Sequence, residues 1–155
     1  MPDAPPTSHS DEHLVARVLV GSPEAEDEFT PRVRAVAARV AEHVAGAERV
    51  DEILAPVLLE MLQSERRWLP GWLPGSVALD AYVAVVAART CIVETDRWRR
   101  LTGPAAAAGP IPVDHPSDLC LASAAAAPAP EDPHIASCPR CHLIVSAARA
   151  ALRNS

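Results

Sequence analysis

The stretch Val77-Ala-Leu-Asp-Ala-Tyr-Val-Ala-Val-Val86 decides the fold class of this chain. Apolar side chains stand at nearly every position, so a helix over this stretch is apolar on nearly all of its faces. Such a helix is stable in water only when other elements cover it all round. We therefore expect an all-α protein, in which the helix that starts at Ser76 and ends in Arg97-Trp-Arg-Arg100 lies in the middle of a bundle.

Three more helices are expected before this central one. Each has apolar side chains three or four residues apart, and they cover residues 10–20, 22–46 and 50–68. Ser22 is expected to cap the second helix, and Pro31 to interrupt or restart it. Pro56 is expected to bend the third helix. The Pro- and Gly-rich segment 68–75 then forms a rigid loop, in which the tryptophans close the core.

Composition and charge limit the function classes. The chain has 155 residues, of which 49% are hydrophobic, so it can bury one core and a small satellite. Its net charge of -6 argues against a surface that holds phosphate backbones, and we do not expect nucleic acid as a partner. An apolar run of 18 residues and a signal peptide are both absent, so we expect a cytoplasmic protein without a membrane partner.

The organisation changes after residue 101. Residues 1–9 are expected to form a disordered tail and residues 10–101 a helical domain. Residues 102–114 are rich in Gly, Pro and Ala, as linkers are. Residues 115–155 are expected to form a small helical module, with a short helix after Ser117 and a final helix from about Pro139 to Leu152.

The small module contains a metal-binding pattern, His134-Ile-Ala-Ser-Cys138-Pro-Arg-Cys141. The spacing H-x3-C-x2-C brings one imidazole and two thiolates together where a turn leads into a helix, and zinc takes four such ligands in a tetrahedron. Cysteines in a reducing compartment favour metal or redox chemistry, whereas Cys91, in an apolar helix, is expected to be a core residue. His142 is expected to be exposed.

Catalytic motifs are missing from the sequence. It has no Gly-rich phosphate loop, no nucleophile elbow and no His-Glu pair of the metalloprotease kind. We therefore expect no catalytic or organic-cofactor residues, and a protein that is not an enzyme. Zn²⁺ is the one cofactor that the pattern predicts, and with four protein ligands it would be structural.

The first domain resembles region 2 of the extracytoplasmic-function sigma factors, a helical module that binds RNA polymerase and melts promoter DNA. The resemblance covers residues 11–100. It rests on the order and spacing of four segments, which are Asp11-Glu-His-Leu-Val-Ala-Arg17, Gly21-Ser-Pro-Glu-Ala25, Phe29-Thr-Pro-Arg-Val33 and Asp96-Arg-Trp-Arg-Arg100. It implies a sigma-region-2-like bundle.

Two departures from that family bear on function. Ala55-Pro56 stands where the family has a Gln-Glu or Gln-Asp step that contacts the polymerase clamp, so the resemblance implies that this contact is lost. Val83-Ala-Val-Val-Ala-Ala88 replaces a helix that is rich in Arg and aromatic residues, and it offers no donors to phosphates or base edges. The family's second DNA-binding domain, a helix-turn-helix, has no counterpart here.

The C-terminal segment resembles the zinc-binding anti-sigma domain, whose signature is His-x3-Cys-x2-Cys at the start of a helix, with one further Cys or His upstream. By that resemblance His134, Cys138 and Cys141 are zinc ligands. The upstream ligand is His115 as first choice, or Cys120 as the alternative.

Three functional hypotheses follow from these resemblances. The favoured one is a transcription-regulatory interaction protein that binds a sigma factor, RNA polymerase or another regulator through apolar helix faces. The second is a thiol redox sensor, in which oxidation pairs Cys120 with Cys138 or Cys141 and releases zinc. The third is a sigma-like DNA-binding transcription factor. A linker over 102–114 is also compatible with a self-inhibited arrangement, in which the anti-sigma-like module folds onto the sigma-like domain.

Overall fold

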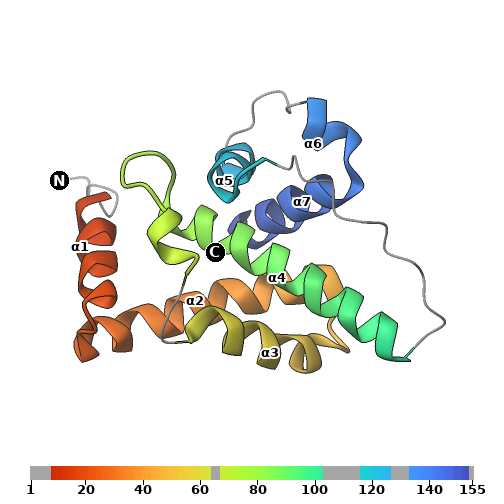
Figure 1. The fold of residues 1–155 in the computed structure, drawn as a ribbon, viewed down its shortest axis with the longest axis horizontal. Helices are drawn as coiled ribbons and strands as arrows, with labels where there is room; N and C mark the ends of the chain where they lie inside the picture. The colour runs from red at the N-terminus through yellow and green to blue at the C-terminus, as the bar shows by residue number, and fades with distance from the viewer. Residues whose placement is uncertain (1–7, 64–66, 103–115, 127–132, 154–155) are drawn as a thin grey trace.

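The computed structural model describes residues 8–63, 67–102, 116–126 and 133–153, with the backbone alone for 8–10 and 96–102. In these ranges every regular element is helical, which confirms the all-α fold class (Figure 1). The elements are α1 (Ser8–Leu19), α2 (Pro23–Ala45), α3 (Val50–Leu62), the 3₁₀ turn η1 (Leu69–Gly71), α4 (Leu79–Thr102), α5 (Asp118–Ala126), α6 (Pro133–Ser137) and α7 (Pro139–Arg153). Residues 1–7 of the predicted tail and 103–114 of the predicted linker lie outside the described residues, whereas residues 8 and 9 belong to α1 and residue 102 belongs to α4.

The central helix of the fold is α4. It contacts α2 and α3, and it also contacts α5 and α7 (Figure 1). Between Leu79 and Ile92 every side chain is buried except those of Asp80 and Arg89, which are half-buried. The hydroxyl of Thr90, which is also buried, donates to the carbonyl of Val86, so this polar group is satisfied within the helix. The prediction of a helix covered on all sides is confirmed.

The predicted start of α4 and the predicted end of α3 were both wrong. Ser76 does not cap α4, because its hydroxyl donates to the carbonyl of Leu73 in the preceding turn, and the helix begins three residues later. The helix expected to reach Trp68 ends at Leu62, and Trp68 leads instead into η1. Ser76 and Trp68 therefore lie in turns, although the spacing of apolar residues in the sequence extends the helices to them.

The second helix is continuous through Pro31, contrary to the expected interruption. A proline removes one backbone hydrogen bond from a helix. Here Phe29 and Val33, on either side of it, are fully buried in the core, and this packing holds both halves of α2 in line. The predicted cap is present, since the hydroxyl of Ser22 accepts a hydrogen bond of 3.5 Å from the backbone N–H of Ala25.

The segment after α3 is fixed by its aromatic side chains, as a rigid loop requires. The indole of Trp68 donates to the carbonyl of Met61 (2.9 Å), and the indole of Trp72 donates to the carbonyl of Val77 (3.0 Å). The hydroxyl of Tyr82 on α4 donates to the carbonyl of Trp68 (2.7 Å). These bonds tie the loop to both neighbouring helices.

This arrangement makes Gly71 sensitive to substitution. A Cβ atom at this position would overlap the hydroxyl of Tyr82. We expect Gly71→Ala to lower the free energy of unfolding by about 1–3 kcal/mol, because the Tyr82 hydrogen bond is broken or the ring is displaced. Urea unfolding of Gly71→Ala, with Tyr82→Phe and the double variant, measures this effect. Equal costs of Gly71→Ala with and without the Tyr82 hydroxyl would contradict the account.

The C-terminal helices share the core of the bundle. α7 contacts α2 and α4, and the buried side chains of both parts form one continuous cluster. Arg39 on α2 donates to the carbonyl of Ala151 on α7 (3.0 Å), and Arg89 on α4 forms a two-bond ion pair with Asp118 on α5 (3.1 and 2.9 Å). The parts on either side of the predicted linker, whose contact the sequence leaves open, therefore pack on each other.

A second ionic group joins α1, α2 and α4. The guanidinium of Arg32 on α2 contacts Asp11 on α1 (2.6 Å) and Asp80 on α4 (2.7 Å). Its hydrogen bond to Asp11 outweighs the effect of burial and raises the pKa of Arg32, so the charge is retained at any ordinary pH. This cation therefore links three helices.

Among the helices that the structure describes, none combines the length and the apolar character that crossing a membrane requires.

Candidate metal centre

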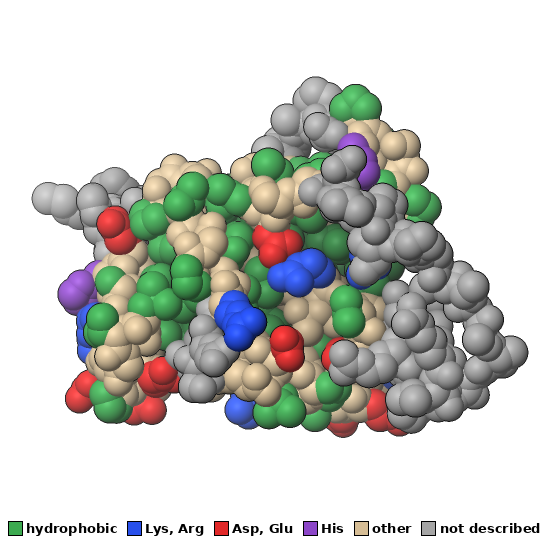
Figure 2. Space-filling model, in the orientation of Figure 1, with side chains coloured by type: hydrophobic (Ala, Val, Ile, Leu, Met, Phe, Trp, Pro, Cys, Tyr) green, Lys and Arg blue, Asp and Glu red, His purple; other side chains and the backbone are tan. Residues whose placement is uncertain are grey.

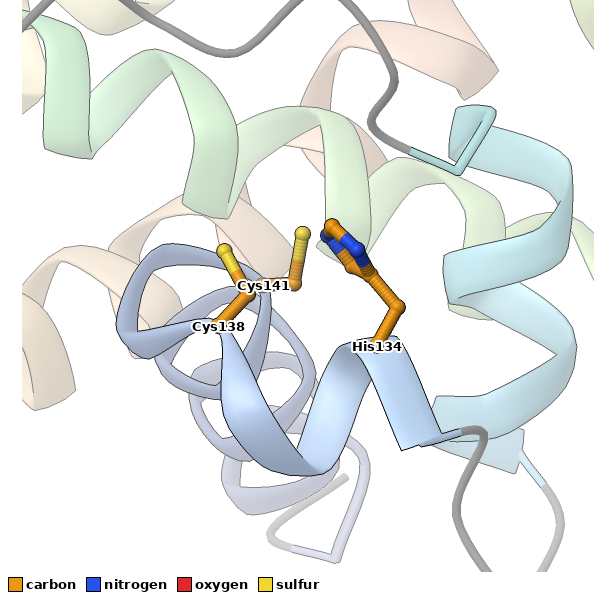
Figure 3. Close-up of side chains that lie close together, drawn as sticks. All are labelled: His134, Cys138 and Cys141. Atoms are coloured by element: carbon orange, nitrogen blue, oxygen red, sulfur yellow. The ribbon is translucent and has the colours of Figure 1, made fainter.

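The candidate ligands come from the junction of α6 and α7. The backbone N–H of Cys138 donates to the carbonyl of His134 (2.8 Å), and that of His142 donates to the carbonyl of Cys138 (2.9 Å). Helical hydrogen bonding thus continues through Cys138, although α6 and α7 are separate elements. Residues four and then three apart lie on one side of such a path, so the side chains of His134, Cys138 and Cys141 converge (Figure 3).

The three side chains are close enough to share one ion. Their ligand atoms, one imidazole nitrogen and two sulfurs, all lie within 4.8 Å of one another. A tetrahedral zinc ion needs separations of about 3.5–3.8 Å, as its bonds to sulfur and nitrogen are about 2.3 and 2.0 Å long. Binding would therefore bring the ligand atoms closer by up to about 1 Å. The group could therefore bind a metal ion, and its soft donors suit zinc better than magnesium or calcium.

Burial differs among the three ligands. Cys141 is 1% exposed and belongs to the hydrophobic core, whereas Cys138 and His134 are half-buried. Ile135, between them in sequence, is also buried. The candidate centre thus lies at the edge of the core, with one ligand fixed by packing and two that an arriving ion can reach.

The two thiols differ in acidity. Backbone N–H groups at the start of α7, above all that of Cys141, donate to the Cys138 sulfur and lower the pKa of Cys138. Burial raises the pKa of Cys141 to about 11. Cys138 is therefore the first of the pair to become a thiolate, and metal binding must displace a proton from Cys141.

Alkylation of metal-stripped protein tests this order. We expect iodoacetamide to modify Cys138 faster than Cys141, and Cys91 slowest of the three. Burial raises the pKa of Cys91 to about 12 and also hides its sulfur. Peptide mapping by mass spectrometry over a time course measures the rates. Faster modification of Cys141 than of Cys138 would contradict the geometry.

The fourth ligand stays a prediction. His115 lies outside the described residues. Cys120 is exposed on α5 and is not part of the group that the described residues form. His142 is exposed, as expected, and is likewise not part of the group, while Cys91 is a fully buried core residue, also as expected.

Comparison with known proteins gives no relative. No family model matches the chain, and neither a curated protein nor a solved structure matches it. The sigma-like and anti-sigma-like parts are therefore resemblances that rest on sequence segments alone.

Sequence reasoning missed the charged residues that join α5 to the bundle. Arg89 and Asp118 are 29 positions apart, and a pairing at that separation leaves no local pattern to read. The same holds for Arg149, whose guanidinium donates to the carbonyl of Ala124 (2.9 Å) and ties α7 to α5. These contacts join α5 to α4 and to α7, the helix that carries Cys141.

Proposed function

We propose that the chain is a non-enzymatic regulatory protein of transcription in the cytoplasm. In this proposal the sigma-like bundle and a zinc-stapled C-terminal module together bind a protein partner, either a sigma factor or RNA polymerase. The observation that carries it is the convergence of His134, Cys138 and Cys141 where α6 meets α7. The sequence segments that resemble the two families supply the transcriptional context.

The role proposed for zinc is structural. A zinc ion supplies a four-way cross-link, and with His115 or Cys120 as fourth ligand it has no position for a reactive water. α6 has five residues, too few for a stable helix by itself. His134 would fasten this turn to α7, while Cys141 holds the same centre to the core.

Exposed apolar side chains support a protein partner. Leu59 on α3 is 65% exposed, and Ala55, one turn earlier on the same face, is also exposed. α3 thus presents apolar atoms where the sigma family has a polar polymerase contact. An interface there would rest on apolar burial, as the fully buried centres of protein interfaces often do.

The same structure disfavours DNA as a partner. Val83 to Ala88 are all buried, so none of these side chains can reach a base edge or a phosphate. This supports a protein-binding role over the alternative of a sigma-like DNA-binding factor. An electrophoretic shift with promoter DNA that weakens as salt rises would favour that alternative instead.

Binding assays on the full zinc-loaded chain test the proposal. Immobilised protein is exposed to core RNA polymerase and, separately, to purified sigma factors. We expect specific retention of one of them, weakened by about tenfold or more in Leu59→Glu if α3 supplies the interface. Retention of neither would remove the transcriptional part of the proposal.

One observation favours a second candidate, a thiol redox sensor. The sulfurs of Cys138 and Cys141 lie within 4.8 Å of each other, and the pKa of the half-buried Cys138 thiol is lowered by backbone N–H groups. A peroxide would oxidise the pair to a disulfide, with loss of both thiol protons and reduction of the peroxide to water. Cys120 is outside this group, so the two neighbours are the pair that the geometry favours. Zinc content and partner affinity that peroxide leaves unchanged would rule this candidate out.

A further inference from the structure

A cavity of about 550 Å³ lies where α3, η1, α4 and the start of α5 meet. Its volume is in the range of small-molecule sites, about 300–1,000 Å³. Part of its lining is apolar or aromatic, namely Met61, Trp68, Tyr82 and Val86. These side chains are buried or half-buried, so they form a fixed wall rather than a mobile one.

The lining of the cavity also carries charges of both signs. Arg67 and Arg89 line it together with Glu60 and Asp118. Figure 2 shows acidic and basic side chains next to each other near the middle of this face. Among the residues that the structure describes, two positive and two negative groups line the cavity, so a ligand that is only an anion or only a cation meets as much repulsion as attraction from them.

Two of these groups keep hydrogen-bonding capacity. Arg89 uses Nε and Nη2 for Asp118, and its Nη1 makes no hydrogen bond with the residues that the structure describes. Glu60 is exposed and forms no ion pair or hydrogen bond within the same residues. A positively charged hydrogen-bond donor, Nη1 of Arg89, and a negatively charged acceptor, the Glu60 carboxylate, thus line the same cavity.

We propose that this cavity binds a small zwitterion with an apolar body, of the class of the aromatic or large aliphatic α-amino acids. The ligand's carboxylate accepts from Nη1 of Arg89, its ammonium group donates to Glu60, and its apolar part lies against the half-buried Trp68. This site is additional to the partner-binding function. The cavity is formed by both parts of the chain, because Asp118 lies on α5 and the other charged lining residues lie in the helical bundle that precedes it.

Calorimetric titration of the full zinc-loaded chain tests the site with three matched probes. L-phenylalanine carries both charges, 2-phenylethylamine lacks the carboxylate, and 3-phenylpropionate lacks the ammonium group. We expect phenylalanine to bind at least about tenfold more tightly than either of the others, because each lost charge removes a charge-assisted hydrogen bond. Equal or tighter binding of a singly charged probe overturns the proposal, and so does the absence of binding by all three.

Variants locate the binding. Glu60→Gln, at an exposed position, is expected to remove the preference for phenylalanine over 3-phenylpropionate, and Arg89→Gln to weaken both. Glu28→Gln, at an exposed position on α2 that does not line the cavity, is the matched control and is expected to bind like the wild type. Because Arg89→Gln also breaks the link to Asp118, Glu60→Gln decides the outcome if the Arg89 variant does not fold. Wild-type selectivity in Glu60→Gln overturns the proposal.

Discussion

The variant Cys141→Ser is expected to weaken zinc binding by at least about a hundredfold, since mutation of residues that only orient metal ligands already lowers metal affinity 10–100-fold. Cys141 combines two roles, because its sulfur is a candidate ligand and its side chain is 1% exposed in the core. A metal present at a thousand times its dissociation constant adds about 4 kcal/mol to stability. Its loss should lower the melting temperature of a chain of this size by about 10 °C.

Competition with a chromophoric chelator gives the affinity, and thermal unfolding with and without zinc gives the stability. His142→Ala is the matched control, because this residue adjoins Cys141 but is exposed and does not belong to the group. A Cys141→Ser variant that keeps both wild-type zinc affinity and zinc-dependent stability would show that the metal is held elsewhere.

The variant Ala148→Glu is expected to destabilise the whole chain, not only its last helix. Ala148 is fully buried on α7, which contacts both α2 and α4 in one continuous core. Burying an unpaired carboxylate there costs on the order of 4 kcal/mol or more. That is a large part of the 5–15 kcal/mol that stabilises an ordinary domain.

Urea unfolding followed by circular dichroism and by tryptophan fluorescence measures this effect. The tryptophans lie outside α5–α7, so fluorescence reports on the bundle. Leu143 lies on the same helix and is 41% exposed. The control variant Leu143→Glu is therefore expected to change the free energy of unfolding by only about 0.5 kcal/mol. A fluorescence transition that stays at the wild-type urea concentration in Ala148→Glu would mean that the C-terminal helices fold as an independent unit.

The central helix and the ligand group were predictable because both follow from short-range spacing. The run from Val77 to Val86 has no polar face, so its composition alone predicts that other elements cover the helix on all sides. The spacing of His134, Cys138 and Cys141 likewise places three donors on one side of a helical path. Neither conclusion needs knowledge of distant residues.

The errors arose where non-local packing or turn chemistry decides the outcome. Pro31 does not interrupt α2, because buried residues on either side of it hold the helix together. The hydroxyl of Ser76 donates to the carbonyl of Leu73 in the preceding turn instead of capping the following helix, and the local sequence is compatible with either hydrogen bond. The docking of α7 has no strong signal either, because alanines such as Ala148 pack equally well in many arrangements.

The zinc content of the purified chain tests the central claim most directly. Protein is prepared without chelators, and its bound metals are counted by mass spectrometry for the wild type and for the variants Cys138→Ser, His115→Ala and Cys120→Ser. We predict about one zinc ion per wild-type chain, loss of that zinc in Cys138→Ser, and loss in one of the other two, which identifies the fourth ligand. Wild-type protein that carries no zinc, and gains no stability when zinc is added, would contradict the account.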